Sequence, residues 1–232
     1  MRLAIMQPYF FPYVGYFQLI AAADVFVVYD NIKYTKKGWI NRNRLLRDGR
    51  DVTFSLPLKA ASDDADVCER SLAADFDRGK LINQIREAYR KAPHFAPVFA
   101  LVEEIVRFDD PNLFNFLRNS IERTCRHLGL GTQLRNSSTV EIDHTLKGED
   151  KVLALCQAMG AEHYVNAIGG LELYDRERFR AHGVDLKFIK PAAFEYAQFG
   201  APFVPWLSII DVMMFNAPDT IAARLAHGYE LI

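Results

Sequence analysis

Three polar side chains follow short apolar runs, at the points where those runs end. Gln7 follows residues 3–6, Asp30 follows residues 25–29, and Asn166 closes the run that begins at His163. Each run is long enough for a buried strand and too short for a helix. Because ligands bind beyond the carboxyl ends of parallel strands, we expect these side chains to face one cleft.

The loop of residues 7–16 combines aromatic rings with an amide and a glycine. Gly15 stands next to an expected helix start, where the backbone can approach a ligand closely and the helix N-terminus favours phosphate. Tyr9 and Tyr13 are candidates to stack on a nucleobase or a sugar. The alternative is that the rings of this loop pack into the core, and the sequence leaves both interpretations open.

A basic segment follows at residues 33–44, with five Lys or Arg side chains and no acid. Arginine forks and lysine heads suit phosphate or pyrophosphate groups. If the segment is extended, its two asparagines share one face and its two arginines the other. We interpret it as an anion site, and its alternation of basic and aromatic residues also fits an RNA partner. The candidate residues are Lys33, Trp39, Asn41, Arg42, Asn43 and Arg44.

A glycine pair, Gly169 and Gly170, lies between an expected strand and an expected helix over 171–182. Such a junction can cradle an anion. Glu172 is a candidate acid or base there, although carboxylates in a first helical turn commonly interact with the helix dipole instead.

Ser208 and Asp211 are three residues apart in an apolar stretch over 207–215, so they share one helix face. They are candidate ligand-binding groups, because polar side chains in an apolar helix need partners. The alternative is a capping box in which Ser208 begins the helix and Asp211 completes the motif.

The elements that must position these residues indicate an α/β fold. Residues 3–29 are typical of a strand, loop, helix and strand, and a second such unit spans 163–189. We predict a Rossmann-like parallel sheet, with a further edge strand over 52–58 that ends near Pro57. Helices are expected over 14–23, 81–89, 98–106, 110–128 and 149–159. The whole chain, 1–232, is predicted to be a single domain with a helical insert near 78–145.

Composition sets limits on function. The chain has 28 Lys+Arg and 29 Asp+Glu residues, 50% hydrophobic residues and 12% aromatic residues. This balance is typical of a globular protein and argues against a general nucleic-acid binder. The apolar runs are too short for a membrane span, and three scattered cysteines indicate reduced thiols and a cytoplasmic location. No metal-ligand spacing is visible, so we predict no metal site.

Four sequence stretches together resemble the WbqC-like protein family. They are residues 5–17, residues 38–43, residues 164–175 with the glycine pair, and residues 207–216 with Ser208 and Asp211. The resemblance spans essentially the whole chain. It implies a role in bacterial surface polysaccharide work, because family members occur among O-antigen biosynthesis functions.

A second resemblance, confined to about the first 60 residues, is to nucleotidylyltransferases and pantothenate synthetase. Those enzymes bind ATP phosphates with an HxGH element at the helix start. Here the matching residues are Tyr13, Val14, Gly15 and Tyr16, so the glycine is present and both histidines are replaced by tyrosine. Tyrosine donates a hydrogen bond but carries no positive charge, which argues against adenylyl transfer.

Three hypotheses follow from these patterns. The first is a transferase that moves an acyl or aminoacyl group onto an activated amino sugar, with Asp30 and Lys33 as catalytic groups, a nucleotide sugar or other phosphate-bearing ligand as substrate, and tRNA as a candidate aminoacyl donor. The second is a nucleotidylyltransferase-like or adenylate-forming enzyme that uses ATP and magnesium. The third is a non-enzymatic binding module in a polysaccharide assembly complex.

Overall fold

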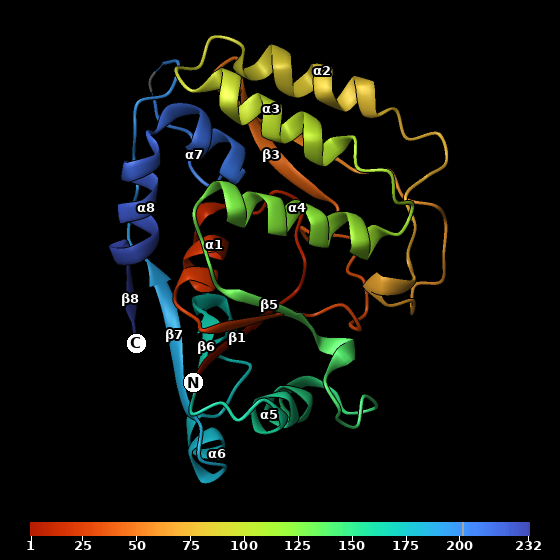
Figure 1. Ribbon diagram of the computed structural model, residues 1–232, viewed down its shortest axis with the longest axis vertical. Coiled ribbons are helices and arrows are strands. Elements are labelled where there is room, and N and C mark those ends of the chain that lie inside the picture. The colour runs from red at the N-terminus through yellow and green to blue at the C-terminus, as the bar shows by residue number, and fades with distance from the viewer. Residues whose placement is uncertain (201) are drawn as a thin grey trace.

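The computed structural model describes residues 1–200 and 202–232, and these form a six-stranded sheet with helices on both faces (Figure 1). The strand order is β5-β2-β1-β6-β7-β8, and every pair is parallel except β7 with β8. The predicted Rossmann-like parallel sheet is therefore confirmed. The strands are β1 (Arg2–Met6), β2 (Val25–Val28), β5 (Gln133–Asn136), β6 (His163–Ala167), β7 (Asp185–Pro191) and β8 (Tyr229–Leu231).

The central strands are apolar because both of their faces are covered. In β1, Ala4 joins the core on one face, whereas Leu3 and Ile5 join the core on the other. In β2, Phe26 and Val28 likewise face one core, whereas Val25 and Val27 face the other. The short continuous apolar runs of the sequence thus correspond to strands in the middle of the sheet.

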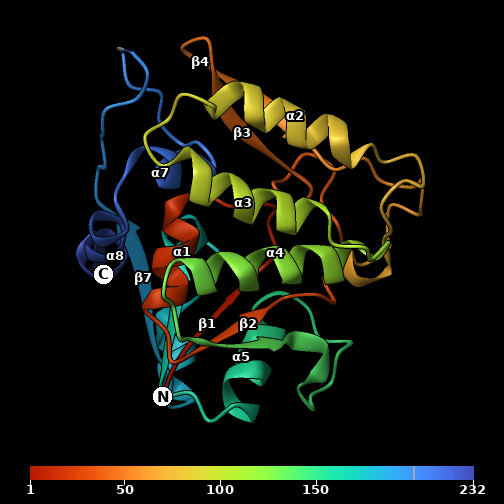
Figure 2. The same cartoon turned by 45° about the horizontal axis from the view of Figure 1, so that its top comes forward.

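Two helix layers cover the sheet. One face carries α1 (Val14–Ala21) and α8 (Pro218–His227), and the opposite face carries α5 (Gly148–Ala158) and α6 (Arg176–Ala181) (Figure 1). On the side of α1, the helices α2 (Arg78–Tyr89), α3 (Phe95–Val106) and α4 (Leu113–His127) lie one beyond another, with α7 (Ile209–Phe215) against α3 (Figure 2). Short 3₁₀ turns are η1 (Val67–Glu69), η2 (Ser137–Thr139) and η3 (Ile168–Gly170).

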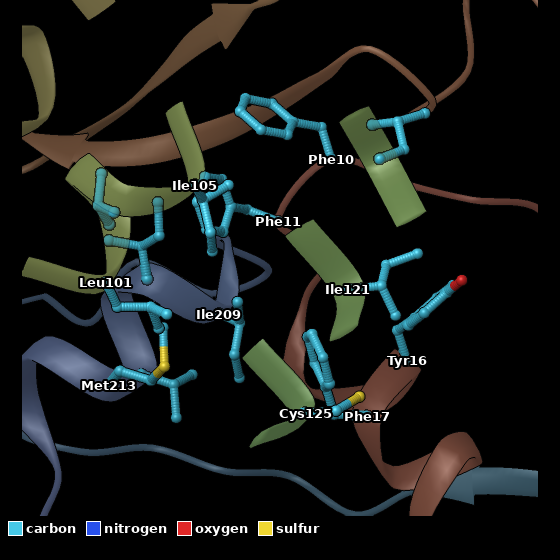
Figure 3. Packing of buried hydrophobic residues seen from close by; sticks show 14 of the residues in the cluster. Phe10, Phe11, Tyr16, Phe17, Leu101, Ile105, Ile121, Cys125, Ile209 and Met213 are labelled. Carbon is cyan, nitrogen blue, oxygen red and sulfur yellow. The ribbon is translucent and has the colours of Figure 1, made fainter. Parts of the chain in front are cut away.

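Part of the aromatic loop belongs to the core. Phe10 and Phe11 are fully buried, and their rings lie among side chains of α3, α4 and α7 (Figure 3). Tyr16 and Phe17, in the first turn of α1, are also buried. The core interpretation therefore holds for these four rings, while Tyr9 and Tyr13 remain half-buried.

Several element boundaries differ from the prediction for local reasons. The strand expected over 52–58 is β4 (Arg50–Ser55), which pairs with β3 (Arg42–Arg47) in a separate hairpin and not with the main sheet. The hairpin turn is Asp48-Gly49, and both residues have positive φ, as a two-residue turn requires. The helix expected from 171 begins at Arg176, because Asp175 caps it by accepting a hydrogen bond from the Glu177 N–H.

One predicted helix start and one alternative capping motif differ from the structure. The helix expected from 110 begins at Leu113, because Asn112 is its cap and accepts a hydrogen bond from the Asn115 N–H. Ser208 does cap α7, as predicted. Asp211 does not complete a capping box, because its carboxylate accepts hydrogen bonds from other elements.

The helices α2 to α4 occupy residues 78–127 of the predicted insert, and the remainder returns to the sheet as β5. The single-domain assignment for residues 1–232 stays a prediction. Among the described residues, no helix is both long and apolar enough to cross a membrane. The same residues contain no cluster of three or more His, Cys, Asp or Glu side chains placed to hold a metal ion.

Candidate ligand site at the carboxyl edge of the sheet

The carboxyl ends of the parallel strands are level with one another. Met6 of β1 pairs with Val28 of β2, Val28 pairs with Asn136 of β5, and Ala4 of β1 pairs with Val165 of β6. The residues that follow the strands therefore share one edge. Successive strands extend outward in opposite directions from the β1–β6 pair, so the strand order reverses there, which is where open α/β sheets bind ligands.

The loop after β1 places neutral polar groups at this reversal point. The Gln7 side-chain oxygen accepts a hydrogen bond of 3.3 Å from the Tyr9 hydroxyl, and the Gln7 carbonyl accepts one of 3.0 Å from the Tyr16 hydroxyl. Burial raises the pKa of Tyr9 and of Tyr13, so both hydroxyls stay neutral donors at physiological pH.

The absence of a side chain at Gly15 leaves space for the ring of Tyr13. A Cβ atom at this position would lie 2.4 Å from the Cζ and hydroxyl oxygen of Tyr13. The Tyr13 ring therefore covers the first turn of α1, the place where a phosphate was expected to approach Gly15. Glycine is therefore needed at position 15 because the Tyr13 ring packs closely against its Cα atom.

Asn43 and Ser208 hold the same loop in place. The Asn43 amide donates hydrogen bonds to the carbonyls of Phe10 and Phe11, at 3.1 and 2.8 Å, and the Ser208 hydroxyl donates to the Phe11 carbonyl at 2.8 Å. Phe11 has a φ of 43°, in the left-handed region that non-glycine residues rarely adopt. These two predicted binding residues thus stabilise the strained turn of the loop, which positions Tyr9 and Tyr13.

The remaining residues of the basic segment also have partners within the chain. Asn41 accepts from the Tyr34 hydroxyl and donates to the Leu56 carbonyl, both at 2.8 Å, and Arg42 Nε donates to the Gly38 carbonyl at 2.9 Å. The segment is extended only from Arg42 onward, in β3, whereas Asn41 lies in a bend just before it.

Three of the five basic side chains form ion pairs. Lys33 Nζ lies 2.6 Å from an Asp64 oxygen and Lys36 Nζ lies 2.7 Å from an Asp63 oxygen. These pairs come from the acid-rich segment at 60–66, which neutralises much of the basic segment. Within the described part of the chain, Lys37 and Arg42 have no ion pair, and of the two the Arg42 guanidinium has the forked geometry that suits phosphate.

The loop after β6 brings Asn166 and Gly170 together. Asn166 is buried, and its side-chain oxygen accepts a hydrogen bond of 2.7 Å from the Ala167 N–H. A Cβ atom at Gly170 would lie 2.5 Å from the Asn166 amide nitrogen, whereas nothing lies within 4 Å of such an atom at Gly169. Gly170 therefore sets the position of this amide, while Glu172 is exposed to solvent.

Asp30 connects the ends of β2 and β5. It is 3% exposed, and one carboxylate oxygen accepts hydrogen bonds from the Ser137 hydroxyl and the Ser138 N–H, at 2.7 and 2.9 Å. The other oxygen accepts a bond of 2.5 Å from the Ser138 hydroxyl. Ser138 is exposed and lines a shallow surface hollow of about 480 Å³ together with His144. Neither serine was singled out by the sequence.

Lys151, in the first half of α5, is a second group that sequence reasoning missed. It is 5% exposed, its Nζ donates to the Asn31 carbonyl at 2.9 Å, and it lies 5.2 Å from the Tyr29 ring centroid. Burial lowers the pKa of Lys151, and the carboxylates of Asp66 and Asp30 oppose that effect. The available signal was its spacing of four residues from Leu155, which puts a lysine on the buried face of a helix.

Asp211 lies away from the strand ends, in the core near α7. It is fully buried, and it accepts hydrogen bonds from the hydroxyls of Tyr89 and Tyr196, at 2.9 and 2.7 Å, and from the Gln198 amide at 2.9 Å. Burial raises the pKa of its carboxyl group. Both oxygens are thus used within the protein, to fasten the segment of residues 192–207.

Tyr13, Trp39 and Arg44 gather around a residue that the sequence did not single out, Trp206. The Arg44 guanidinium lies 5.3 Å from the Trp39 ring centroid and donates a hydrogen bond of 2.9 Å to the Trp206 carbonyl. The rings of Tyr13 and Trp206 are 5.9 Å apart. These four residues, which we name the aromatic corner, lie beside the loop that follows β1.

Comparisons with known proteins identify the family of the chain. The model of the WbqC-like protein family matches residues 7–223. The uncharacterised protein Rv1507c of Mycobacterium tuberculosis is 30% identical over 226 residues, a match that covers 94% of this chain and 96% of that protein. No solved structure matches.

Proposed function

Because this chain belongs to the WbqC-like protein family, we propose that it is an enzyme of bacterial surface polysaccharide biosynthesis. Its reaction is the transfer of an acyl or aminoacyl group to an activated amino sugar, in the context of O-antigen assembly. The substrate lies across the reversal point between β1 and β6, at the carboxyl edge of the sheet.

One observation carries this proposal. The strand register brings the Gln7 loop and the Asn166 loop to the same level, at the point where the strand order reverses. Both loops present amides and tyrosine hydroxyls, and such neutral groups can donate to and accept from the hydroxyl and amide groups of a sugar. We assign the phosphate of an activated sugar to the guanidinium of Arg42, at the start of β3 in the separate hairpin.

The reaction needs a base. The amine nitrogen of the sugar forms a bond to the acyl carbon, the bond from that carbon to the donor oxygen or sulfur breaks, and the amine loses a proton. We propose that the proton passes through the Ser138 hydroxyl to Asp30, since the hydroxyl reaches solvent and the carboxylate accepts its hydrogen bond at 2.5 Å. Lys33 is assigned no role in this step, because its ammonium group is paired with Asp64.

The direct test is product formation. Purified protein is incubated with nucleotide-activated amino sugars and with acyl-coenzyme A or aminoacyl-tRNA donors, and mass spectrometry detects a sugar whose mass has risen by the acyl group. We expect Asp30→Asn and Ser138→Ala to lower the rate by about 10²–10⁴-fold, the usual contribution of general acid–base catalysis.

Asp24→Asn is the matched control, because Asp24 precedes the amino end of the same strand and is exposed. Its rate is expected to equal that of the unaltered protein. No product with any donor and acceptor pair would refute the transferase proposal. Normal rates in folded Asp30→Asn and Ser138→Ala proteins would refute the assignment of the base.

The ATP hypothesis receives less support from the geometry. The Tyr13 ring fills the space beside Gly15 at the start of α1, and Tyr16 is buried with its hydroxyl bonded to the Gln7 carbonyl. An ATP phosphate at this helix start would therefore require the Tyr13 ring to move. A rise in melting temperature with millimolar ATP and magnesium would reverse this preference.

A further inference from the structure

Both tryptophans of the chain lie in the aromatic corner. The sequence contains two, Trp39 and Trp206, and their side chains are 42% and 65% exposed. Tryptophan is usually largely buried, because its ring is the largest apolar side chain. The two exposed tryptophans are 167 residues apart in the sequence and share the partner Arg44. Their exposure on one surface is not required for the folding of either segment alone.

Hydrogen bonds to the neighbouring backbone fix the position of the aromatic corner. Trp206 has a φ of 60°, a conformation that non-glycine residues rarely adopt. The Arg44 guanidinium fixes its carbonyl, and the next residues are tied down where the Ser208 N–H donates to the Arg44 carbonyl at 3.0 Å. On the other side, the Phe10 N–H donates to the Ile40 carbonyl at 3.1 Å, which joins the Trp39 segment to the loop after β1.

The charge of the corner is balanced. One terminal nitrogen of the Arg44 guanidinium donates to an Asp51 carboxylate oxygen at 3.2 Å and the other donates to the Trp206 carbonyl at 2.9 Å, while its buried Nε has no partner. Its positive charge is therefore already compensated, which disfavours a phosphate at this place. Exposed aromatic faces beside planar polar groups suit a ring with apolar C–H faces and hydroxyl edges, which is the chemistry of a pyranose.

We propose that the aromatic corner is the subsite for the sugar ring, with Trp39 and Trp206 contacting its C–H faces and the Arg44–Asp51 pair facing its hydroxyls. The inference rests on the proposed function for its location, because Tyr13 is the residue that precedes α1 at the carboxyl edge of β1. It assigns Arg44 to the sugar ring, and it leaves the phosphate to Arg42.

The position of the tryptophans provides the measurement. Because the chain has no others, its intrinsic tryptophan fluorescence reports on the aromatic corner alone. The probes are glucose, galactose, mannose, N-acetylglucosamine and N-acetylgalactosamine, each free and as its uridine or guanosine diphosphate derivative. We expect a saturable change in intensity or emission wavelength with at least one sugar in both forms, and no change with UDP or GDP alone.

Variants identify the residues responsible. Trp206→Ala retains Trp39 as reporter, Trp39→Ala retains Trp206, and each is expected to bind the responding sugar at least tenfold more weakly. Phe199→Ala is the matched control, because Phe199 is an aromatic residue of the same segment that is 49% exposed and packs on Phe215 instead of the corner. Its affinity for the sugar is expected to be unchanged. Thermal melting establishes that each variant is folded.

Three outcomes would overturn the inference. They are a fluorescence signal that does not respond to any sugar of the panel, a response to UDP or GDP equal to that of the nucleotide sugar, and a signal that changes with protein concentration alone, which would make the corner a contact between copies of the chain. Sugar binding without acyl transfer would refute the proposed function and leave the subsite standing. Acyl transfer without any change in tryptophan fluorescence would refute the subsite and leave the proposed function standing.

Discussion

The hydrogen bonds around Asp211 predict that two tyrosine hydroxyls contribute unequally to stability. Both Tyr89 and Tyr196 donate to the buried Asp211 carboxylate. The Tyr89 hydroxyl also makes a second hydrogen bond, because its oxygen accepts from the buried Leu46 N–H of β3 at 2.9 Å. Substitution by phenylalanine removes one hydroxyl in each case and leaves the ring in place.

The expected magnitudes follow from what each substitution leaves behind. Tyr196→Phe removes one hydrogen bond to a charged group, worth roughly 1.5–3 kcal/mol, and the carboxylate keeps its bonds from Tyr89 and Gln198. Tyr89→Phe removes a bond of the same kind and also leaves the Leu46 N–H without a partner, which costs about 1–3 kcal/mol more. We therefore expect Tyr89→Phe to lower the free energy of unfolding by roughly twice as much.

Urea unfolding at pH 7, followed by circular dichroism, measures the difference. Equal losses in the two variants, or losses below about 0.5 kcal/mol in both, would refute the reasoning, since the structure gives Tyr89 an acceptor role that Tyr196 lacks. The total stability of such a domain is about 5–15 kcal/mol, so both variants are expected to fold.

The same carboxyl group predicts a pH dependence. Its pKa is raised in the folded state, so folding favours the protonated form. The stabilisation from this preference is fully present below the unfolded pKa of about 4 and is lost as pH rises through the folded pKa. The stability of the unaltered protein relative to Asp211→Asn should therefore fall as pH rises from about 4 to 7. A difference independent of pH in this range would contradict it.

Three further predictions concern single sites. Asn43→Ala leaves the Phe10 carbonyl without its side-chain donor and leaves the Phe11 carbonyl with the Ser208 hydroxyl alone, so it should lower the free energy of unfolding by roughly 1–3 kcal/mol in urea titrations. Asp30→Asn keeps one oxygen to accept from the Ser137 hydroxyl and the Ser138 N–H but replaces charge-assisted bonds with neutral ones, and should cost about 1–3 kcal/mol. Asp24→Asn, whose amide oxygen can still accept from the Arg2 N–H and whose ion pair with Arg2 is exposed, should cost less than about 1 kcal/mol. Burial raises the pKa of the Cys68 thiol to about 11 and of the Cys125 and Cys156 thiols to about 12. The two buried thiols, Cys125 and Cys156, should therefore react with a disulfide reagent at pH 8 only after unfolding, and the half-buried Cys68 thiol more slowly than a free thiol. Rapid labelling of the folded protein would contradict those values.

The central strands could be predicted because burial on both faces makes them apolar. β1, β2, β6 and β7 agree with the predicted strands to within two residues. β5 was missed, because it lies at the sheet edge and its residues Gln133–Asn136 are polar or half-exposed. α8 was missed although Pro218 stands at its first turn, a signal that favours a helix start.

The candidate site shows a different limit. The sequence identified Ser208 and Asp211 as polar residues that need partners and Asn43 as a candidate ligand-binding residue, and in the structure all three have partners within the protein itself. It could not indicate which partners, because Ser208 meets the aromatic loop only through tertiary structure. Trp206 and Ser138 were missed for the same reason. Their hydrogen-bond partners, Arg44 and Asp30, lie more than 100 positions away in the sequence.

The anchoring of the aromatic loop has a consequence for the order in which the protein is completed during synthesis. The loop after β1 is among the first segments to leave the ribosome, yet the Ser208 hydroxyl that holds the Phe11 carbonyl is made 197 residues later. At typical elongation rates of about 5–20 residues per second, that interval is on the order of ten seconds or more. Until then the strained Phe11 turn lacks one of its two side-chain donors, and the core around its apolar rings lacks the side chains of α7. The nascent chain therefore carries an exposed aromatic segment that chaperones could recognise, and the ligand edge takes its final shape only when α7 has docked.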